Sequence, residues 1–153
     1  MVGCLLNIYR CMKRIIVLYG HHDCGKTQTL NCLCELIREN GGESKSKQKS
    51  PYSNDISEVF LYKGQIVCVC TGGDTGEIVA ENLEYANEAN ADIVFTASRT
   101  RGASIDSINA EAGKHGIQVE WLPKSYEYEL CEETQKLCNK EVAKILLEKL
   151  YKE

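Results

Sequence analysis

The sequence lacks several features that would assign it to a common class of protein. No apolar run approaches the roughly 18 residues that a membrane-spanning helix needs. The 18 basic and 22 acidic side chains give a formal net charge of −4, so the broad cationic surface of a nucleic-acid-binding protein is missing. Nine cysteines are present, but no two are spaced C-x₂-C, which excludes the usual zinc-site spacing. Neither a membrane nor a nucleic acid is therefore an expected partner.

The 153 residues are enough for one domain with one core. Cys32 and Cys34 lie in a helical pattern, and Cys68 and Cys70 alternate with valines in a strand pattern. We interpret most cysteines as small buried side chains of a cytoplasmic protein, because the cytoplasm keeps thiols reduced. Residues 1–11 do not fit the domain pattern. We expect a poorly ordered extension there, with Met12 as the natural start and one domain over residues 12–153.

Residues 20–27, here called the glycine loop, read G-x-x-x-x-G-K-T. A β-type apolar run at 15–19 precedes the glycine loop, and helical periodicity over about 26–39 follows it. Its glycines allow backbone N–H groups to turn inward, where they and the helix N-terminus bind phosphates. Lys26 is expected at the outer phosphates and the Thr27 hydroxyl on a Mg²⁺ ion. The candidate nucleotide-binding residues are Gly20, His21, His22, Asp23, Cys24, Gly25, Lys26, Thr27 and Gln28.

With this motif the chain resembles the P-loop NTPase superfamily, firmly over about residues 14–40 and more loosely elsewhere. The resemblance implies that the chain binds a nucleoside triphosphate together with Mg²⁺. The guanine signature N-K-x-D is missing, because the corresponding strand end reads Thr96-Ala97-Ser98-Arg99. We therefore expect ATP rather than GTP.

Apolar runs and helical patterns alternate as β-α-β-β-α-β-α-β-α, which predicts an α/β fold, a three-layer α/β/α sandwich with a mostly parallel five-stranded sheet. The hairpin signal Lys63-Gly64 resembles the small GTPase-like and kinase-like branch of the superfamily. That resemblance implies strand order 2-3-1-4-5 with strand 2 antiparallel. The predicted strands are 15–19, 56–62, 65–70, 92–97 and 117–122, and the predicted helices are 26–39, 76–90, 104–113 and 133–151.

Residues 41–54 are polar and carry three lysines, which predicts a mobile loop. This segment is either a solvated connector or a lid or switch over the phosphates, since long loops in compact domains are often functional.

The carboxyl ends of the parallel strands should bring four segments together: residues 20–27, 71–77, 98–103 and 122–126. Asp74 follows the most buried strand and is our candidate for the acid associated with Mg²⁺. In the small GTPases, which this region resembles, the acid stands at the strand's last residue, which here is Cys70. The alternative is that Asp74 caps the next helix. Glu77 either positions a water or takes a proton from the substrate, or it only interacts favourably with the helix dipole.

Arg99 and Arg101 follow the next strand. Guanidinium groups suit phosphate geometry, so either residue could stabilise charge in phosphoryl transfer; the alternative is a surface ion pair. The Cys24 thiol lies beside a helix N-terminus, where a lowered pKa would allow redox control. His21 and His22 either contact a phosphate or are simply exposed. Trp121 is expected in the core, whereas Tyr126 and Tyr128 lie near the expected position of the base.

The sequence thus predicts a cytoplasmic ATP-binding P-loop protein, either a small phosphotransferase (kinase-like) or a simple ATPase. Its catalytic residues would be Lys26, Asp74, Arg99 and Arg101, and its metal-binding residues would be Thr27 and Asp74. The partners would be the nucleoside triphosphate and either a small-molecule phosphate acceptor or a protein. Two alternatives stay open: a nucleotide-dependent switch acting through a partner, and a non-catalytic nucleotide-binding domain.

Overall fold

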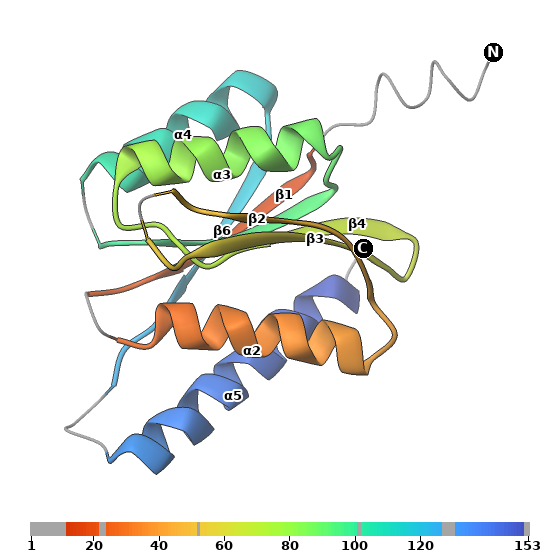
Figure 1. The fold of residues 1–153 in the computed structure, drawn as a ribbon. Helices are drawn as coiled ribbons and strands as arrows, with labels where there is room; N and C mark the ends of the chain where they lie inside the picture. The colour runs from red at the N-terminus through yellow and green to blue at the C-terminus, as the bar shows by residue number, and fades with distance from the viewer. Residues whose placement is uncertain (1–11, 22–23, 52, 101, 127–130, 152–153) are drawn as a thin grey trace.

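A computed structural model describes residues 12–21, 24–51, 53–100, 102–126 and 131–151. A six-stranded sheet lies between two layers of helices (Figure 1). The strands are β1 (Arg14–Tyr19), β2 (Glu43–Lys49), β3 (Ile56–Tyr62), β4 (Gln65–Cys70), β5 (Ile93–Ser98) and β6 (Gln118–Pro123). The helices are α2 (Lys26–Glu39), α3 (Gly76–Glu88), α4 (Ala103–His115), α5 (Glu132–Glu148) and the short 3₁₀ helix η1 (Lys149–Tyr151). Residues 1–11, the expected extension, lie outside the described part of the chain.

The strand order is β2-β3-β4-β5-β1-β6. Strands β4, β5, β1 and β6 are parallel, and β3 is antiparallel to both of its neighbours. The α/β class and the antiparallel second predicted strand are therefore confirmed. The predicted order is wrong, because β5 lies between β4 and β1 and the five predicted strands follow the order 2-3-4-1-5. All six β5 residues are buried, which suits a central strand, but apolar runs do not specify their neighbours.

The sixth strand is β2, which forms the edge of the sheet within the segment that we predicted as a mobile loop over residues 41–54. All seven β2 side chains are exposed, so the strand has no alternation of apolar and polar residues. It is held by antiparallel backbone pairing to β3, which does not depend on side-chain type. Lysines along an exposed edge also oppose pairing with another chain.

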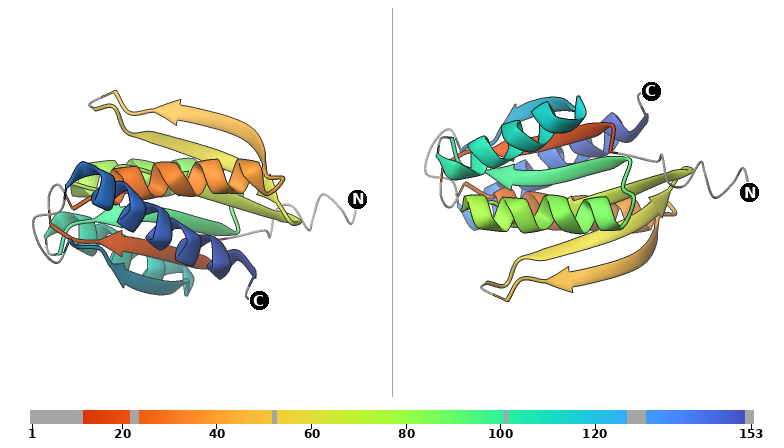
Figure 2. Two further views of the ribbon diagram at one scale, coloured as in Figure 1. Left: turned by 90° about the horizontal axis from the view of Figure 1, so that it is seen from below. Right: turned by 90° about the horizontal axis from the view of Figure 1, so that it is seen from above.

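Two hydrophobic clusters pack against the two faces of the sheet. Helices α2 and α5 lie side by side on one face, and α3 and α4 on the other (Figure 2). Along β1 the side chains alternate between the faces: Ile16 and Leu18 pack toward α2 and α5, whereas Ile15 and Val17 pack toward α3 and α4. Both helix layers therefore fix the position of the strand that leads into the glycine loop.

Helix α2 spans the predicted residues 26–39, and the Lys63-Gly64 hairpin is confirmed, with both residues at positive φ. Two apolar residues of the predicted helix 133–151 do not face the core. Leu137 is 65% exposed and Ile145 is 47% exposed, because the stripe of α5 that faces the core runs through Asn139, Ala143, Leu146 and Leu147, and Leu150 continues it in η1.

Trp121 is also not a core residue, since it is 37% exposed. It lies on β6, which is an edge strand, and packs edge-on against the ring of Tyr19 at 6.1 Å between centroids. In the part of the chain that the structure describes, no helix combines the length and the apolar character needed to cross a membrane.

Candidate functional site

The glycine loop joins β1 to α2 at the carboxyl ends of the parallel strands. The Gly20 N–H donates a 3.1 Å hydrogen bond to the Ser98 oxygen at the end of β5. On the other side, the Lys124 N–H donates to the Tyr19 oxygen at 2.7 Å. The start of the loop is thus fixed between the ends of β5 and β6. Two of its predicted ligands, His22 and Asp23, lie outside the described residues.

Helix α2 begins at a position suited to binding an anion. Gly25 precedes its first turn with φ of 88°, a left-handed conformation that favours glycine. The first turn carries Lys26, Thr27 and Gln28, none of which is acidic. The first N–H groups of a helix have no partner within it, and the helix dipole is positive at this end. The turn therefore offers donors and positive potential to a phosphate group.

Gly25 is also required by its surroundings. A Cβ at this position would lie 2.1 Å from Tyr126 Oη and 2.5 Å from Asn139 Oδ1. Tyr126 Oη donates a 3.0 Å hydrogen bond to Asn139 Oδ1, and Thr29 Oγ1 lies 3.3 Å from the same oxygen. Residues from the segment after β6 and from α5 thus hold the end of the loop. Asn139 was not expected at the site; it interrupts the apolar stripe of α5, which is the only sequence signal for it.

The Lys26 side chain folds back over the loop and is 7% exposed. Its Nζ donates to the Gly20 oxygen at 2.6 Å and to the His21 oxygen at 3.3 Å. Burial lowers the pKa of Lys26, whereas the neighbouring Cys24 and Asp74 oppose this shift. Among the described residues, both of these contacts are neutral carbonyl groups and neither is a carboxylate. A bound phosphate would give the ammonium a charged partner.

Thr27 Oγ1 donates a 3.2 Å hydrogen bond to the Thr71 oxygen, directly after β4. Thr71 is 3% exposed, and its own hydroxyl accepts from the Ile56 N–H at 2.9 Å and lies 3.3 Å from Asp55 Oδ1. The first turn of α2 is therefore linked through the end of β4 to the start of β3. Nothing in the sequence indicated Asp55 as part of this network.

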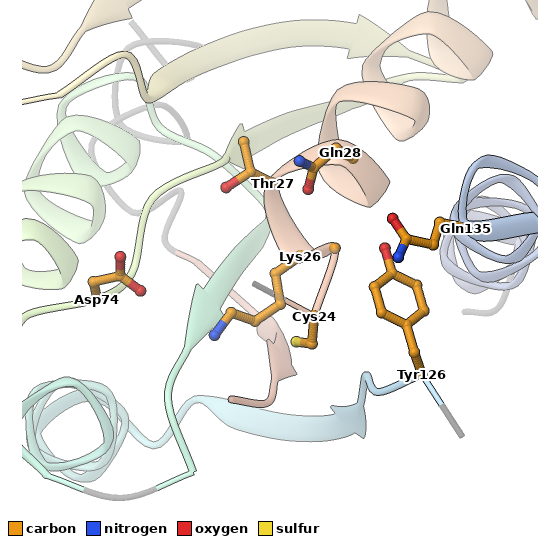
Figure 3. A pocket seen from close by; sticks show the side chains of 8 residues that line it. Cys24, Lys26, Thr27, Gln28, Asp74, Tyr126 and Gln135 are labelled. Atoms are coloured by element: carbon orange, nitrogen blue, oxygen red, sulfur yellow. The ribbon is translucent and has the colours of Figure 1, made fainter. Parts of the chain in front are cut away.

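A cavity of about 290 Å³ opens beside the first turn of α2 (Figure 3). Figure 3 shows Asp74 on one side of Lys26, with Tyr126 and Gln135 on the other. The cavity is lined by Cys24, Gly25, Lys26, Thr27, Gln28, Asp74, Tyr126 and Gln135. The structure thus brings together most of the predicted nucleotide-binding residues with the predicted acid, and adds Gln135 from α5. Tyr126 lines this cavity, whereas Tyr128 lies outside the described residues.

Asp74 faces the cavity and also approaches Arg99, with 3.6 Å between Oδ1 and Nε. Both side chains are close to half exposed. The alternative in which Asp74 caps α3 is wrong, because Thr75 is the N-cap and its Oγ1 accepts the Ile78 N–H. Arg99 does not line the cavity itself and approaches it through this ion pair with Asp74, and Arg101 lies outside the described residues. Glu77 is exposed in the first turn of α3.

The oxygen atoms of Thr27 and Asp74 at the cavity are too few to hold a metal ion by themselves, but they suit Mg²⁺ bound together with phosphates. Among the described residues, no group of three or more His, Cys, Asp or Glu side chains is arranged to hold a metal ion. Mg²⁺ usually keeps several waters and binds one or two protein oxygens together with substrate phosphates. The Thr27 hydroxyl and the Asp74 carboxylate, both at the cavity, fit such a site.

Of the remaining predicted ligands, Cys24 is buried and lines the cavity, whereas the exposed Gln28 lies at its rim. His21 is exposed, and its backbone oxygen is the part that contacts Lys26.

In comparisons with known proteins, no family model and no curated protein matched the chain. Among solved structures, a match was found to EndoMS in its apo form, with 18% identity and a TM-score of 0.35. It covers 61% of this chain and 46% of the EndoMS chain, so the chain spans less than half the length of that protein. A likeness this weak carries no argument about fold or function.

Proposed function

We propose that the protein is an ATP-binding P-loop protein that uses Mg²⁺, either a small phosphotransferase or a simple ATPase of the cytoplasm. The observation that carries this proposal is the buried Lys26 ammonium, which bonds two loop carbonyl groups at the N-terminus of a helix without acidic residues in its first turn. This arrangement favours the phosphates of a nucleotide over a neutral ligand. The seven described cysteines are all free, which suits a reducing compartment.

In this proposal each residue has a separate role. Lys26 exchanges its two carbonyl partners for the outer phosphate oxygens, and the first-turn N–H groups of α2 hold the remaining phosphates. Thr27 and Asp74 hold the Mg²⁺ ion, which when bound neutralises phosphate charge. Arg99 leaves Asp74 to contact the charge that develops on the transferred phosphoryl group, and we assign Arg101 the same task.

Thermal-shift measurements with ATP, GTP, ADP, AMP and inorganic phosphate, each with and without Mg²⁺, test the binding proposal. We expect ATP with Mg²⁺ to raise the melting temperature most, because binding to the native state stabilises it. The Lys26→Ala variant is the control for binding elsewhere on the chain. A parent protein that no nucleotide stabilises would contradict the proposal. An acceptor-library assay then separates a phosphotransferase, which turns over only with an acceptor, from an ATPase.

A second candidate function, a nucleotide-dependent switch, is favoured by the link between Thr27 and the start of β3. A metal bound through a lone pair of Thr27 Oγ1 would reposition the hydroxyl that donates to the Thr71 oxygen, and Thr71 also contacts Asp55 and Ile56. Hydrogen exchange at the Asp55 and Ile56 amides, compared between ATP and ADP, distinguishes the two functions. A switch requires different protection in the two states, whereas a phosphotransferase does not.

A further inference from the structure

Lys124 is one of the most deeply buried charged side chains among the described residues, with 2% of its surface exposed. It follows β6, and its Nζ donates a 2.9 Å hydrogen bond to the Cys24 oxygen in the glycine loop. The same Nζ lies 3.9 Å from the centroid of the Tyr126 ring and 3.9 Å from Cys138 Sγ. None of these contacts is a carboxylate, so the described part of the chain gives this ammonium no anionic partner in contact.

A buried charge without a counter-ion is unfavourable, because the free energy lost when the charge leaves water exceeds the stabilisation that neutral hydrogen-bond partners provide. Burial accordingly lowers the pKa of Lys124, while the Cys138 and Cys24 thiols oppose the shift. The contacts within the described part of the chain therefore do not account for this residue through stability alone. A bound anion on the other side of the loop would supply an opposite charge.

The contact with Cys24 also orients the loop. A peptide group is planar and trans, so its C=O and N–H point in opposite directions. Lys124 holds the Cys24 oxygen on the β6 side of the loop, which directs the Gly25 N–H to the opposite side. That N–H immediately precedes the first turn of α2, whose residues line the cavity. The Lys124 ammonium thus fixes the direction of a loop donor and adds a second positive charge behind it.

We propose that Lys124 is a positioning residue of the phosphate site, a second buried cation that aims the Gly25 N–H at the bound phosphates and stabilises their charge from behind the loop. This inference rests on the proposed function, since it requires an anionic ligand at the glycine loop. It adds a residue to the site from outside the loop, and nothing in the loop sequence points to it.

The test compares Lys124→Met with Lys149→Met in the full chain. Both variants remove one positive charge. The Lys149 ammonium pairs with Glu120, which also pairs with Arg14. Arg14 is the first residue of β1, so this cluster lies at the end of the strand away from the glycine loop. Calorimetry with ATP, ADP and pyrophosphate measures binding, and the melting temperature of the unliganded proteins measures stability. We expect Lys124→Met to weaken ATP binding at least about tenfold, and to weaken ADP binding less because it carries less charge.

For the unliganded protein we expect Lys124→Met to melt within about 5 °C of the parent, because the lost hydrogen bond opposes the relief of a buried charge. Lys149→Met should bind ATP as the parent does. Lys124→Gln keeps an N–H donor without the charge, and it should bind ATP with intermediate affinity. It takes the place of Lys124→Met in the comparison if that variant does not fold.

Three outcomes are decisive. If Lys124→Met and Lys124→Gln both bind ATP and pyrophosphate within twofold of the parent, the proposal for Lys124 is wrong and the proposed function stands. If the variants lose stability far beyond 5 °C and lose ATP and ADP affinity equally, Lys124 is a structural residue and the proposal is again wrong. If the parent binds none of the three ligands, the proposed function fails, and the role of Lys124 fails with it.

Discussion

Thr27 Oγ1 donates a hydrogen bond to the backbone oxygen of Thr71 at 3.2 Å, which joins the first turn of α2 to the end of β4. Thr71 directly follows Cys70, the position where the resemblance to P-loop proteins implies an acidic residue. Here Cys70 is fully buried, and the acid that reaches the cavity is Asp74. The Thr27 hydroxyl therefore donates to a carbonyl group rather than to a carboxylate.

Replacing Thr27 tests its assignment to Mg²⁺. Thr27→Val keeps the shape of the side chain but removes the oxygen, so Mg²⁺ should no longer strengthen ATP binding in this variant. Thr27→Ser keeps the hydroxyl and should retain the effect of Mg²⁺. Calorimetric titration of ATP with and without Mg²⁺ measures the difference. An equal enhancement by Mg²⁺ in Thr27→Val and the parent would rule out the assignment.

The Lys26 ammonium should distinguish ligands by their outer phosphates. Its two bonds to loop carbonyl groups are available for exchange when a phosphate arrives. We expect Lys26→Ala to weaken triphosphate binding by about 2–3 kcal/mol, as for a charge-assisted hydrogen bond, and AMP binding much less. Calorimetry with ATP and AMP measures both, and circular dichroism checks the fold. Unchanged ATP affinity in the variant would contradict the P-loop interpretation.

The parts of the site that lie within one segment could be predicted from the sequence. The glycine loop, the start of α2 and the Lys63-Gly64 turn each depend on backbone conformations that glycine, lysine spacing and apolar flanks indicate locally. The convergence of Asp74 and Arg99 beside the loop also followed, because parallel strands place their carboxyl ends at one edge of the sheet.

The features that could not be predicted depend on contacts between segments that are distant in the sequence. The position of β5 between β4 and β1 is decided by pairing among strands that are all apolar and look alike in sequence. Strand β2 has no buried side chain, so its pairing with β3 left no hydrophobic pattern. Lys124, which follows β6, reaches the glycine loop without any local signal, and Asn139 on α5 is marked only by its interruption of an apolar stripe.

Alanine substitutions at Gly25 and Gly41 distinguish the effect of backbone strain from the effect of steric contact. Both have positive φ, at 88° and 96°, but a Cβ at Gly41 meets nothing within 4 Å, whereas one at Gly25 meets Tyr126 and Asn139. We expect Gly41→Ala to lower the free energy of unfolding by about 1–2 kcal/mol through strain alone. Gly25→Ala should cost more and should abolish ATP binding. Denaturant unfolding and calorimetry measure both, and equal losses in the two variants would show that the contacts at Gly25 are unimportant.

The Cys34 thiol should make stability fall at alkaline pH. Burial raises the pKa of Cys34 from 9.0 to about 12. Between these values the unfolded chain loses the proton while the folded chain keeps it, so the free energy of unfolding falls as pH rises from about 9. Cys34→Ala should reduce this slope, although it lowers stability at neutral pH. Denaturant unfolding at pH 8, 9, 10 and 11 measures the slopes. Parallel curves for variant and parent would contradict the prediction.

Arg99 can be assigned to phosphoryl transfer or to the surface only by comparing turnover with stability. Its pair with Asp74 is about half exposed and 3.6 Å long, so its loss should change the free energy of unfolding by under about 1 kcal/mol. If Arg99 contacts charge that develops in the transition state, Arg99→Ala lowers turnover at least about tenfold, with a smaller effect on ATP affinity. Arg99→Lys should restore only part of the rate, because an ammonium group cannot make the bidentate contact.

Arg38→Ala is the matched control: Arg38 pairs with Glu58 near the far end of α2, and its loss should affect stability but leave turnover unchanged. Steady-state ATP hydrolysis, or transfer where an acceptor is found, measures all three variants. Turnover in Arg99→Ala equal to that in Arg38→Ala would show that the guanidinium group of Arg99 serves the surface ion pair and not the reaction.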